Sequence, residues 1–145
     1  MYSTTLTKFI EKLNYISSEI HGNITGGREN LKLKYAPNVE YIEDAYEQEK
    51  YLYELLKKSF DNDLKQRTTT KGPHKDDLEF YIDGINARSF GSQGQQRTCA
   101  LSLKLAEISI IEEGSGEKPI LLLDDVMSEL DSVRQKFLVK SLEDI

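Results

Sequence analysis

The sequence contains a single cysteine, Cys99, and no tryptophan among its 145 residues. A lone cysteine excludes a disulfide framework, and it excludes a zinc site built from paired cysteines. We therefore expect a protein of a reducing, cytoplasmic compartment. Cys99 falls within a predicted buried helix, where we expect it to act as a small apolar residue.

Long apolar runs and excess positive charge are missing as well. No stretch approaches the roughly 18–20 residues that cross a bilayer, so no membrane association is predicted. The formal net charge is −6, which argues against attraction of the whole chain to nucleic acid but leaves room for a local basic face. A phosphate-binding lysine loop, GxxxxGK[ST], is also absent.

Residues 1–67 have the pattern of helices around a short strand. Apolar residues at steps of three and four predict an amphipathic helix, which the glycines at 26–27 end; they are Leu6, Phe9, Leu13, Ile16 and Ile20. Alternation over 31–35 predicts a strand, and helical spacing returns over 41–60. We expect the two helices to pack as an antiparallel pair, with their tyrosines packed rather than stacked on bases.

The second half of the chain places strands before and after a long helix. A strand is predicted within 68–83, a hairpin turn at Asp83-Gly84 and a second strand over 86–90. The helix that follows carries apolar residues on two faces, so we expect both faces to be buried. The segment Gly114-Ser115-Gly116 is expected to end this helix.

Pro119 opens the run ILLL at 120–123, whose continuous apolar character is typical of a central parallel strand. A last amphipathic helix is predicted over 133–142. The order of helix, buried strand and helix indicates an α/β fold.

The polar run SQGQQ at 92–96 stands directly before the apolar pattern of the long helix. A serine hydroxyl, a glycine amide and the unpaired N–H groups of a first helical turn form an anion site that needs no lysine. The candidate phosphate contacts are therefore Ser92, Gln93, Gly94 and Gln95.

Two carboxylates, Asp124 and Asp125, follow the apolar run, at the end of the strand where open α/β sheets place their ligands. Adjacent carboxylates are costly to desolvate unless they meet a cation, and Mg²⁺ prefers oxygen ligands beside nucleotide phosphates. Asp124 is then the candidate Mg²⁺ ligand and Asp125 the candidate base for an attacking water. The alternative is that both residues only end the strand and cap the next turn.

The remaining histidines suggest structural roles. His74 lies beside Asp76 and Asp77, but adjacent strand residues point to opposite faces, so a hydrogen-bonded turn is favoured over a metal site. His21 lies near a helix end, where it is expected to interact with the carbonyl dipoles.

Taken in order, SQGQ at 92–95, LLLDD at 121–125 and SELD at 128–131 resemble the signature motif, Walker B strand and D-loop of the ABC-type ATPases. The longer strings GPHKDDL, FGSQGQQRT, LSLKLAE and PILLLDDVMSELD are similar to one branch of this family, which acts in bacterial DNA replication and repair, whereas the SMC-like relatives share only the three short motifs. The likeness is specific over 68–142. It is looser over 1–67, where ITGGRENLKLKY resembles part of the family's inserted helical arm.

The resemblance implies the C-terminal part of an ABC-type P-loop head, an α/β domain with parallel strands, plus an α-helical arm. Residues 1–67 would belong to the arm and residues 68–145 to the C-terminal lobe of the head. The function implied is that of an ATP- and Mg²⁺-dependent homodimer that binds single-stranded or gapped DNA. It would act in recombinational repair, replication and the SOS response, beside other recombination mediator proteins.

Within such a dimer, the signature residues 92–95 would contact the γ-phosphate held by the other subunit. Asp124 would serve Mg²⁺, and Asp125 would be the base. Arg97 would pair the subunits or stabilise its helix. The D-loop, which would signal between the two sites, comprises Ser128, Glu129, Leu130 and Asp131.

The resemblance also predicts a fragment that begins inside the arm, lacks the phosphate-loop lobe and ends before the family's switch histidine. Such a chain would neither bind ATP tightly nor hydrolyse it alone. The alternative is a non-catalytic module that binds DNA or repair partners.

Overall fold

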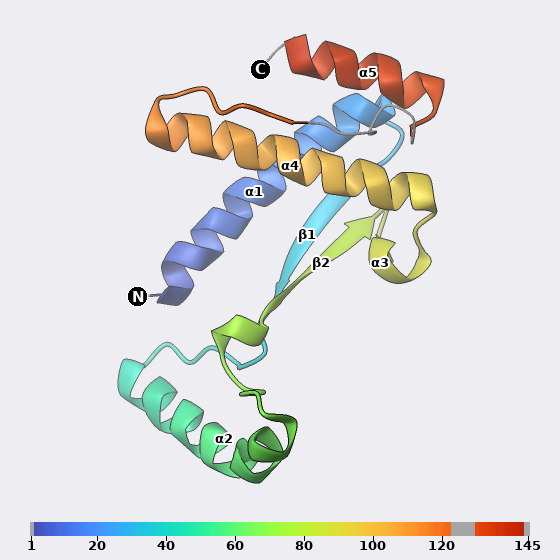
Figure 1. Ribbon diagram of the computed structural model, residues 1–145. Coiled ribbons are helices and arrows are strands. Elements are labelled where there is room, and N and C mark those ends of the chain that lie inside the picture. Colours follow the sequence, from blue (N-terminus) through green and yellow to red (C-terminus); the bar gives the residue numbers. More distant parts are fainter. Residues whose placement is uncertain (1, 123–129, 144–145) are drawn as a thin grey trace. The chain divides into compact units, whose positions relative to one another are not determined.

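The computed structural model describes residues 2–122 and 130–143 (Figure 1). Its contacts divide the chain into two compact units, which are residues 1–34 with 79–145, and residues 35–78. The second unit is thus inserted into the first, between residues 34 and 79 of the chain. This division does not coincide with the boundary at residue 67 that the motifs suggested, because the first helix packs on the helices of the second half.

Helix α1 spans Tyr2–Thr25, and Gly26 and Gly27 end it with positive φ angles of 64° and 73°. Its expected partner was the helix over 41–60, but α1 packs instead on α4 and α5. Its buried face is also rotated from the expected one. Phe9 is exposed, whereas the buried side chains follow a neighbouring stripe that includes polar residues: Ile10, Leu13, Ser17, His21 and Ile24.

Helix α4, Gln93–Ser115, lies across α1 in Figure 1 and ends at Gly116 in the left-handed conformation, as expected. Helix α5, Ser132–Glu143, packs on α1. These helices share one apolar core, to which Ile20, Ile108 and Leu121 add partial cover. The core comprises Ile24, Leu101, Leu105, Leu130 and Leu138. Only one face of α4 is fully buried, and Leu103 and Ile110 on the second face are half-buried.

Besides the helices, the described residues form a three-stranded sheet in the order β1-β2-β3. Strand β1 spans Leu31–Ala36, β2 spans Asp77–Ile82, and β3 is only Ile85–Asn86. The predicted hairpin turn is confirmed, because Asp83 and Gly84 both have positive φ and Ile82 pairs antiparallel with Ile85. The second strand of the hairpin was predicted to reach residue 90. It gives way instead to the short helix α3, Ala87–Phe90, because the Asn86 side chain caps it by accepting from the Ser89 amide.

The inserted unit contains α2, Ala45–Gln66, and the 3₁₀ turn η1, Pro73–Lys75. Asp44 caps α2 by accepting from the Glu47 amide, and Arg67 ends it in the left-handed conformation. Asp63 near the helix end accepts hydrogen bonds from Ser59 and from both polar groups of Thr70. No residue of α2 is fully buried, so this helix is held by its caps and by these hydrogen bonds.

The apolar run at 120–123 was predicted to be a buried parallel strand, but its described part, residues 120–122, is not in a strand. Ile120 is 90% exposed and Leu122 is 88% exposed. A continuous apolar strand is buried only when other strands flank it and helices cover both faces. Among the described residues, no strand lies beside this segment.

Replacement of Leu105 by Ala should lower the free energy of unfolding by about 2–5 kcal/mol, because the side chain is fully buried in the core that joins α1, α4 and α5. Urea denaturation measures this loss. Ile111→Ala on the same helix, where the side chain is 53% exposed, should change stability by no more than about 0.5 kcal/mol. Equal losses in the two variants would contradict the position of the core.

Candidate functional site

The polar run before α4 forms a capped helix start. The Gln95 amide donates to Ser92 Oγ at 3.2 Å, and the Ser92 amide donates to Gln95 Oε1 at 2.9 Å. This reciprocal pair is a capping box, which satisfies two of the amides that a helix start leaves open. Ser92 and Gln93 are exposed at this end, and Gly94 and Gln95 are half-buried.

The loop before this helix is held in place by Gln96. Its side-chain amide donates to the carbonyl oxygens of Ala87 at 3.1 Å and Gly91 at 3.2 Å. Gly91 is required there, because a Cβ atom would lie 2.5 Å from the Ala87 oxygen. The position of Ser92 is therefore fixed from both sides.

The first turn of α4 fits a phosphate group that approaches from solvent. The amides of Gln93 and Gly94 have no acceptor within the part of the chain that the structure describes. The first turn carries no acidic residue, and the positive end of the helix dipole is open. The site offers no lysine, so it can supply part of a nucleotide site but not a complete one.

The segment that begins α5 is the second part of the site. Leu130 is buried in the core, and Asp131 caps α5 by accepting from the amides of Val133 and Arg134, both at 3.0 Å. These hydrogen bonds, with the nearby positive charges of Arg134 and Arg28, lower the pKa of Asp131. The other D-loop residues, Ser128 and Glu129, lie outside the described residues, as do Asp124 and Asp125.

A buried ionic cluster lies between the two helix starts. Glu29 Oε1 accepts from Arg134 Nη2 at 2.8 Å and from Gln95 Nε2 at 3.4 Å. Arg134 also bonds Asp131 through Nη1 at 3.1 Å. The Glu29 and Arg134 side chains are 16% and 15% exposed, so their charges are largely removed from water. Gly94 leaves room for this guanidinium, because a Cβ atom there would lie 3.0 Å from Arg134 Nη1.

His21 of α1 completes the cluster. Its Nε2 atom lies 3.3 Å from Glu29 Oε2, and its Nδ1 atom lies 3.3 Å from the Ser102 hydroxyl on α4. The side chain is fully buried, and this burial lowers its pKa. The Glu29 and Asp83 carboxylates favour the charged form, and Arg134 disfavours it. His21 therefore contributes a neutral imidazole near neutral pH rather than an exposed cation at a helix end.

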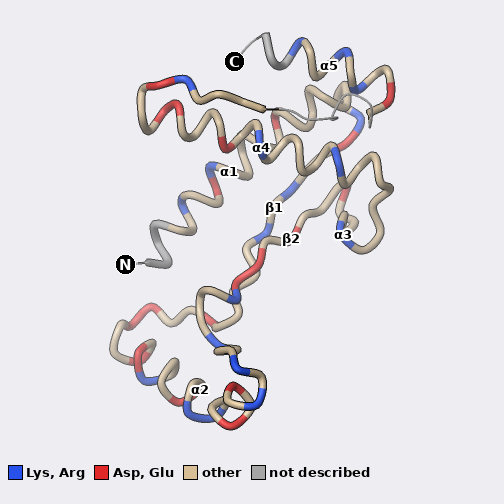
Figure 2. The backbone as a smooth tube through the Cα atoms, in the orientation of Figure 1, with Lys and Arg blue, Asp and Glu red and all other residues tan. Residues whose placement is uncertain are grey.

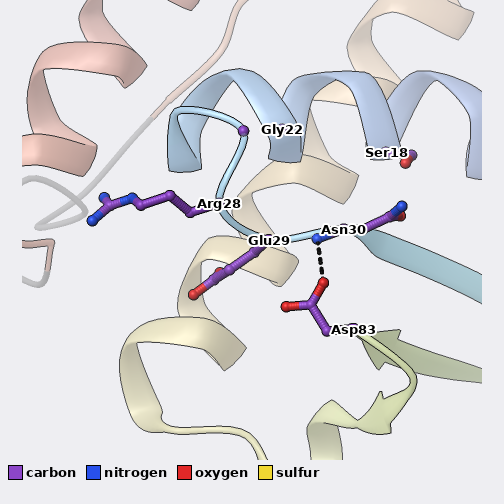
Figure 3. Close-up of a pocket in the computed structure, with 7 residues that line it drawn as sticks. Ser18, Gly22, Arg28, Glu29, Asn30 and Asp83 are labelled. Atoms are coloured by element: carbon purple, nitrogen blue, oxygen red, sulfur yellow. Dashed lines mark hydrogen bonds between the residues drawn. The ribbon is translucent and has the colours of Figure 1, made fainter.

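The loop that carries Glu29 is itself fixed at several points. Arg28 Nε donates to the Thr25 carbonyl at 2.9 Å. Asn30 and Asp83 are joined twice, since the Asn30 amide donates to Asp83 Oδ1 at 3.1 Å and the Asp83 amide donates to the Asn30 carbonyl at 3.0 Å. Figure 3 shows this junction, which borders a polar pocket of about 250 Å³. Arg28 and Glu29 extend away from Asn30 in this view.

The cluster was not predicted from the sequence. A buried stripe counted only from apolar residues omits Ser17 and His21, although both continue the spacing of Ile10 and Leu13. That spacing is the one signal that could have placed His21 in the interior. Glu29 follows two glycines, and nothing local marks its partners, which are 66 and 105 residues away.

Two of the remaining sequence predictions, for Cys99 and for the GPHKDD segment, are confirmed. Cys99 is buried, and burial raises the pKa of its thiol to about 11, as expected for an apolar role. The GPHKDD segment forms the predicted hydrogen-bonded turn. Asp76 accepts hydrogen bonds from the Tyr35 hydroxyl and the Asn38 amide. His74 Nε2 lies 2.9 Å from the Thr69 carbonyl oxygen.

Among the described residues, no group of three potential metal ligands is found, and no helix is long and apolar enough to cross a membrane.

Several known proteins are similar to this chain in sequence. No protein-family model matches the chain. The DNA replication and repair protein RecF of Agathobacter rectalis is 50% identical over 137 residues, or 94% of this chain and 36% of that protein. RecF of Clostridium acetobutylicum is 48% identical over 138 residues. The chain resembles RecF over nearly its whole length.

Solved structures agree with the sequence relatives. The structure of the recombination mediator protein RecF with ATP, in the RecFOR pathway, has a TM-score of 0.73 and 42% identity over 97% of this chain. The chain covers 38% of that protein, and about a third of the curated RecF relatives. The likeness to the RecF structure supports an α/β fold of helices with a small sheet.

The pH dependence of stability should report His21. Its pKa is lowered in the folded chain from the ordinary 6.5, so the unfolded chain binds the proton more readily. His21 therefore contributes stability that is fully present above about pH 6.5 and is lost as the pH falls from there toward the folded pKa. The slope should not exceed about 1.4 kcal/mol per pH unit.

Urea denaturation between about pH 7.5 and 5.5 measures this slope, in a range where carboxylates with ordinary or lowered pKa remain ionised. His21→Gln should flatten it. A variant with the slope of the parent chain would show that His21 does not titrate as its burial requires.

Proposed function

We propose that this chain is the C-terminal part of a RecF-like ATPase, and that its signature loop completes a nucleotide site on a second subunit. The observation that carries the proposal is the capped start of α4, where Ser92 and Gln93 are exposed and the amides of Gln93 and Gly94 have no acceptor among the described residues, without a lysine in the loop. A half-site of this kind fits a phosphate that another subunit holds. The likeness to a RecF structure with ATP supports this assignment.

Each residue would have a distinct task. Ser92 and the amides of Gln93 and Gly94 would bind the γ-phosphate across the dimer, and Gln95 would hold Ser92 in place through the capping box. Asp124 would hold Mg²⁺ and Asp125 would orient and deprotonate the attacking water. Mg²⁺ and ATP would supply the phosphoryl chemistry when bound.

The D-loop, residues 128–131, would connect the two sites of the dimer. Asp131 fits this task because its carboxylate caps α5 and pairs with Arg134, so a displacement of one residue reaches the other. We place the parent protein in the cytoplasm, on single-stranded or gapped DNA, beside other recombination mediators. The RecFOR pathway named for the solved RecF relative supports the association with recombination mediators.

A second candidate is a non-catalytic module that binds a partner. Tyr46, Tyr53 and Phe60 recur every seven residues on α2 and are all exposed. Residues at this spacing lie on one side of a helix, where an apolar partner could cover them. Lysines are interspersed with Asp and Glu along this helix (Figure 2), which favours a protein partner over nucleic acid.

The 145-residue chain by itself should neither bind ATP tightly nor hydrolyse it, because it carries no phosphate-binding lysine loop. Isothermal titration with ATP and Mg²⁺ and a phosphate-release assay measure the two properties. Clear turnover by the purified chain, proportional to its concentration, would refute the half-site.

The signature loop can be tested in a hybrid in which this chain replaces the matching part of Agathobacter rectalis RecF. Ser92→Arg should abolish ATP-driven dimerisation and lower turnover about 100-fold, because a bulky cation would replace a phosphate-binding hydroxyl. Ser115→Arg, at the exposed opposite end of α4, is the matched control and should leave both unchanged. If Ser92→Arg behaves like this control, the binding-module function is favoured.

A further inference from the structure

The contacts of Glu29 suggest a role that neither the motifs nor the comparisons assign. Its carboxylate lies between the first turn of α4 and the first turn of α5, and one oxygen, Oε1, bonds both. Gln95 is the α4 partner and belongs to the capping box of Ser92. Arg134 is the α5 partner and holds the Asp131 carboxylate with its other terminal nitrogen. A continuous chain of polar contacts thus runs from Ser92 to Asp131 through Glu29.

The second oxygen of Glu29 faces α1. It lies 3.3 Å from His21 Nε2, and the other nitrogen of that ring lies near Ser102, ten residues along α4 from Ser92. The imidazole of His21 therefore flanks Glu29 from a third direction without a hydrogen bond to it. The loop that carries it is pinned by Arg28 to the end of α1 and by Asn30 to the β2–β3 turn. The carboxylate has a fixed anchor, and its two partners lie in the first turns of α4 and α5.

We propose that Glu29 is a positioning residue that couples the signature loop to the D-loop, so that displacement of Asp131 is transmitted to Ser92 through Arg134 and Gln95. This inference rests on the proposed function, in which these two segments meet the nucleotide and the second subunit. Low exposure strengthens the link, because a buried carboxylate and a buried guanidinium cannot separate without leaving unpaired charge. Gly94 contributes to the same link, because the absence of a side chain there leaves room for Arg134 beside the start of α4.

The coupling can be measured on the 145-residue chain without nucleotide. Asp131→Asn removes the charge that Arg134 binds on its exposed side. In heteronuclear NMR spectra, this substitution should shift the amide resonances of residues 93–95. The shift should be about five times larger in the parent chain than in a Glu29→Gln background. Glu113→Gln is the matched control, because it removes a more exposed carboxylate that also pairs across α1 and α4, with Lys12 at 2.6 Å. The shift should persist in that background.

Hydrogen exchange separates positioning from general stability. Glu29→Gln should accelerate exchange at residues 95–96 and 133–135, whose amides are hydrogen-bonded at the two helix starts, by about tenfold while leaving the middle of α4 protected. Glu29→Asp, which keeps the charge, should recover part of the coupling. If the shift caused by Asp131→Asn is unchanged in Glu29→Gln, or if exchange rises equally throughout α1 and α4, the proposal is overturned.

A second variant covers the case in which Glu29→Gln does not fold. Gln95→Ala removes the α4 arm of the link, together with the capping-box contact from the Ser92 amide, at a half-buried position, and should also abolish the shift. Persistence of the shift in Gln95→Ala would equally overturn the proposal. These measurements require no ATP, so their failure is distinguishable from failure of the proposed function, which the Ser92→Arg hybrid reports.

Discussion

A carboxylate removed from water needs cationic or hydrogen-bonding partners, and the pairing of Glu29 with Arg134 meets this need where three helices converge. The apolar core beneath it can hold α1, α4 and α5 together, but apolar contacts are not directional. The ion pair is directional, so it sets which turn of α4 faces which turn of α5. The geometry of the candidate site depends on this one interaction more than on any contact within the signature loop.

Local chemistry explains which parts of the fold were predictable. Gly26, Gly27 and Gly116 end helices because they adopt left-handed conformations, and Asp83-Gly84 turns a hairpin for the same reason. Failures occurred where burial depends on distant partners. The face of α1 was misjudged because Ser17 and His21 are buried through hydrogen bonds, and α1 pairs with α4 across more than sixty residues of sequence. The run at 120–122 has strand composition but no flanking strand among the described residues.

The candidate site shows the same limit. Ser92 and Gln95 were predictable, because a capping box is a pattern within four residues and needs no tertiary context. Asp131 was identified by its motif, and the structure adds its capping contacts. Glu29 could not be found, because its partners come from three separate elements and its neighbours in the sequence are unremarkable for a loop. Sequence motifs identify residues that contact a ligand, whereas residues that position those motifs have little local sequence pattern of their own.

The exposed apolar segment at 120–122 has a further consequence for handling the chain. Ile120 and Leu122 present a short hydrophobic, uncharged surface to solvent, next to Pro119, which cannot donate a backbone hydrogen bond. Such a surface promotes self-association at high protein concentration. Solubility of the isolated chain is therefore limited by Ile120 and Leu122, which lie outside the core, and a single charge placed at Leu122 would be the least disruptive way to raise it.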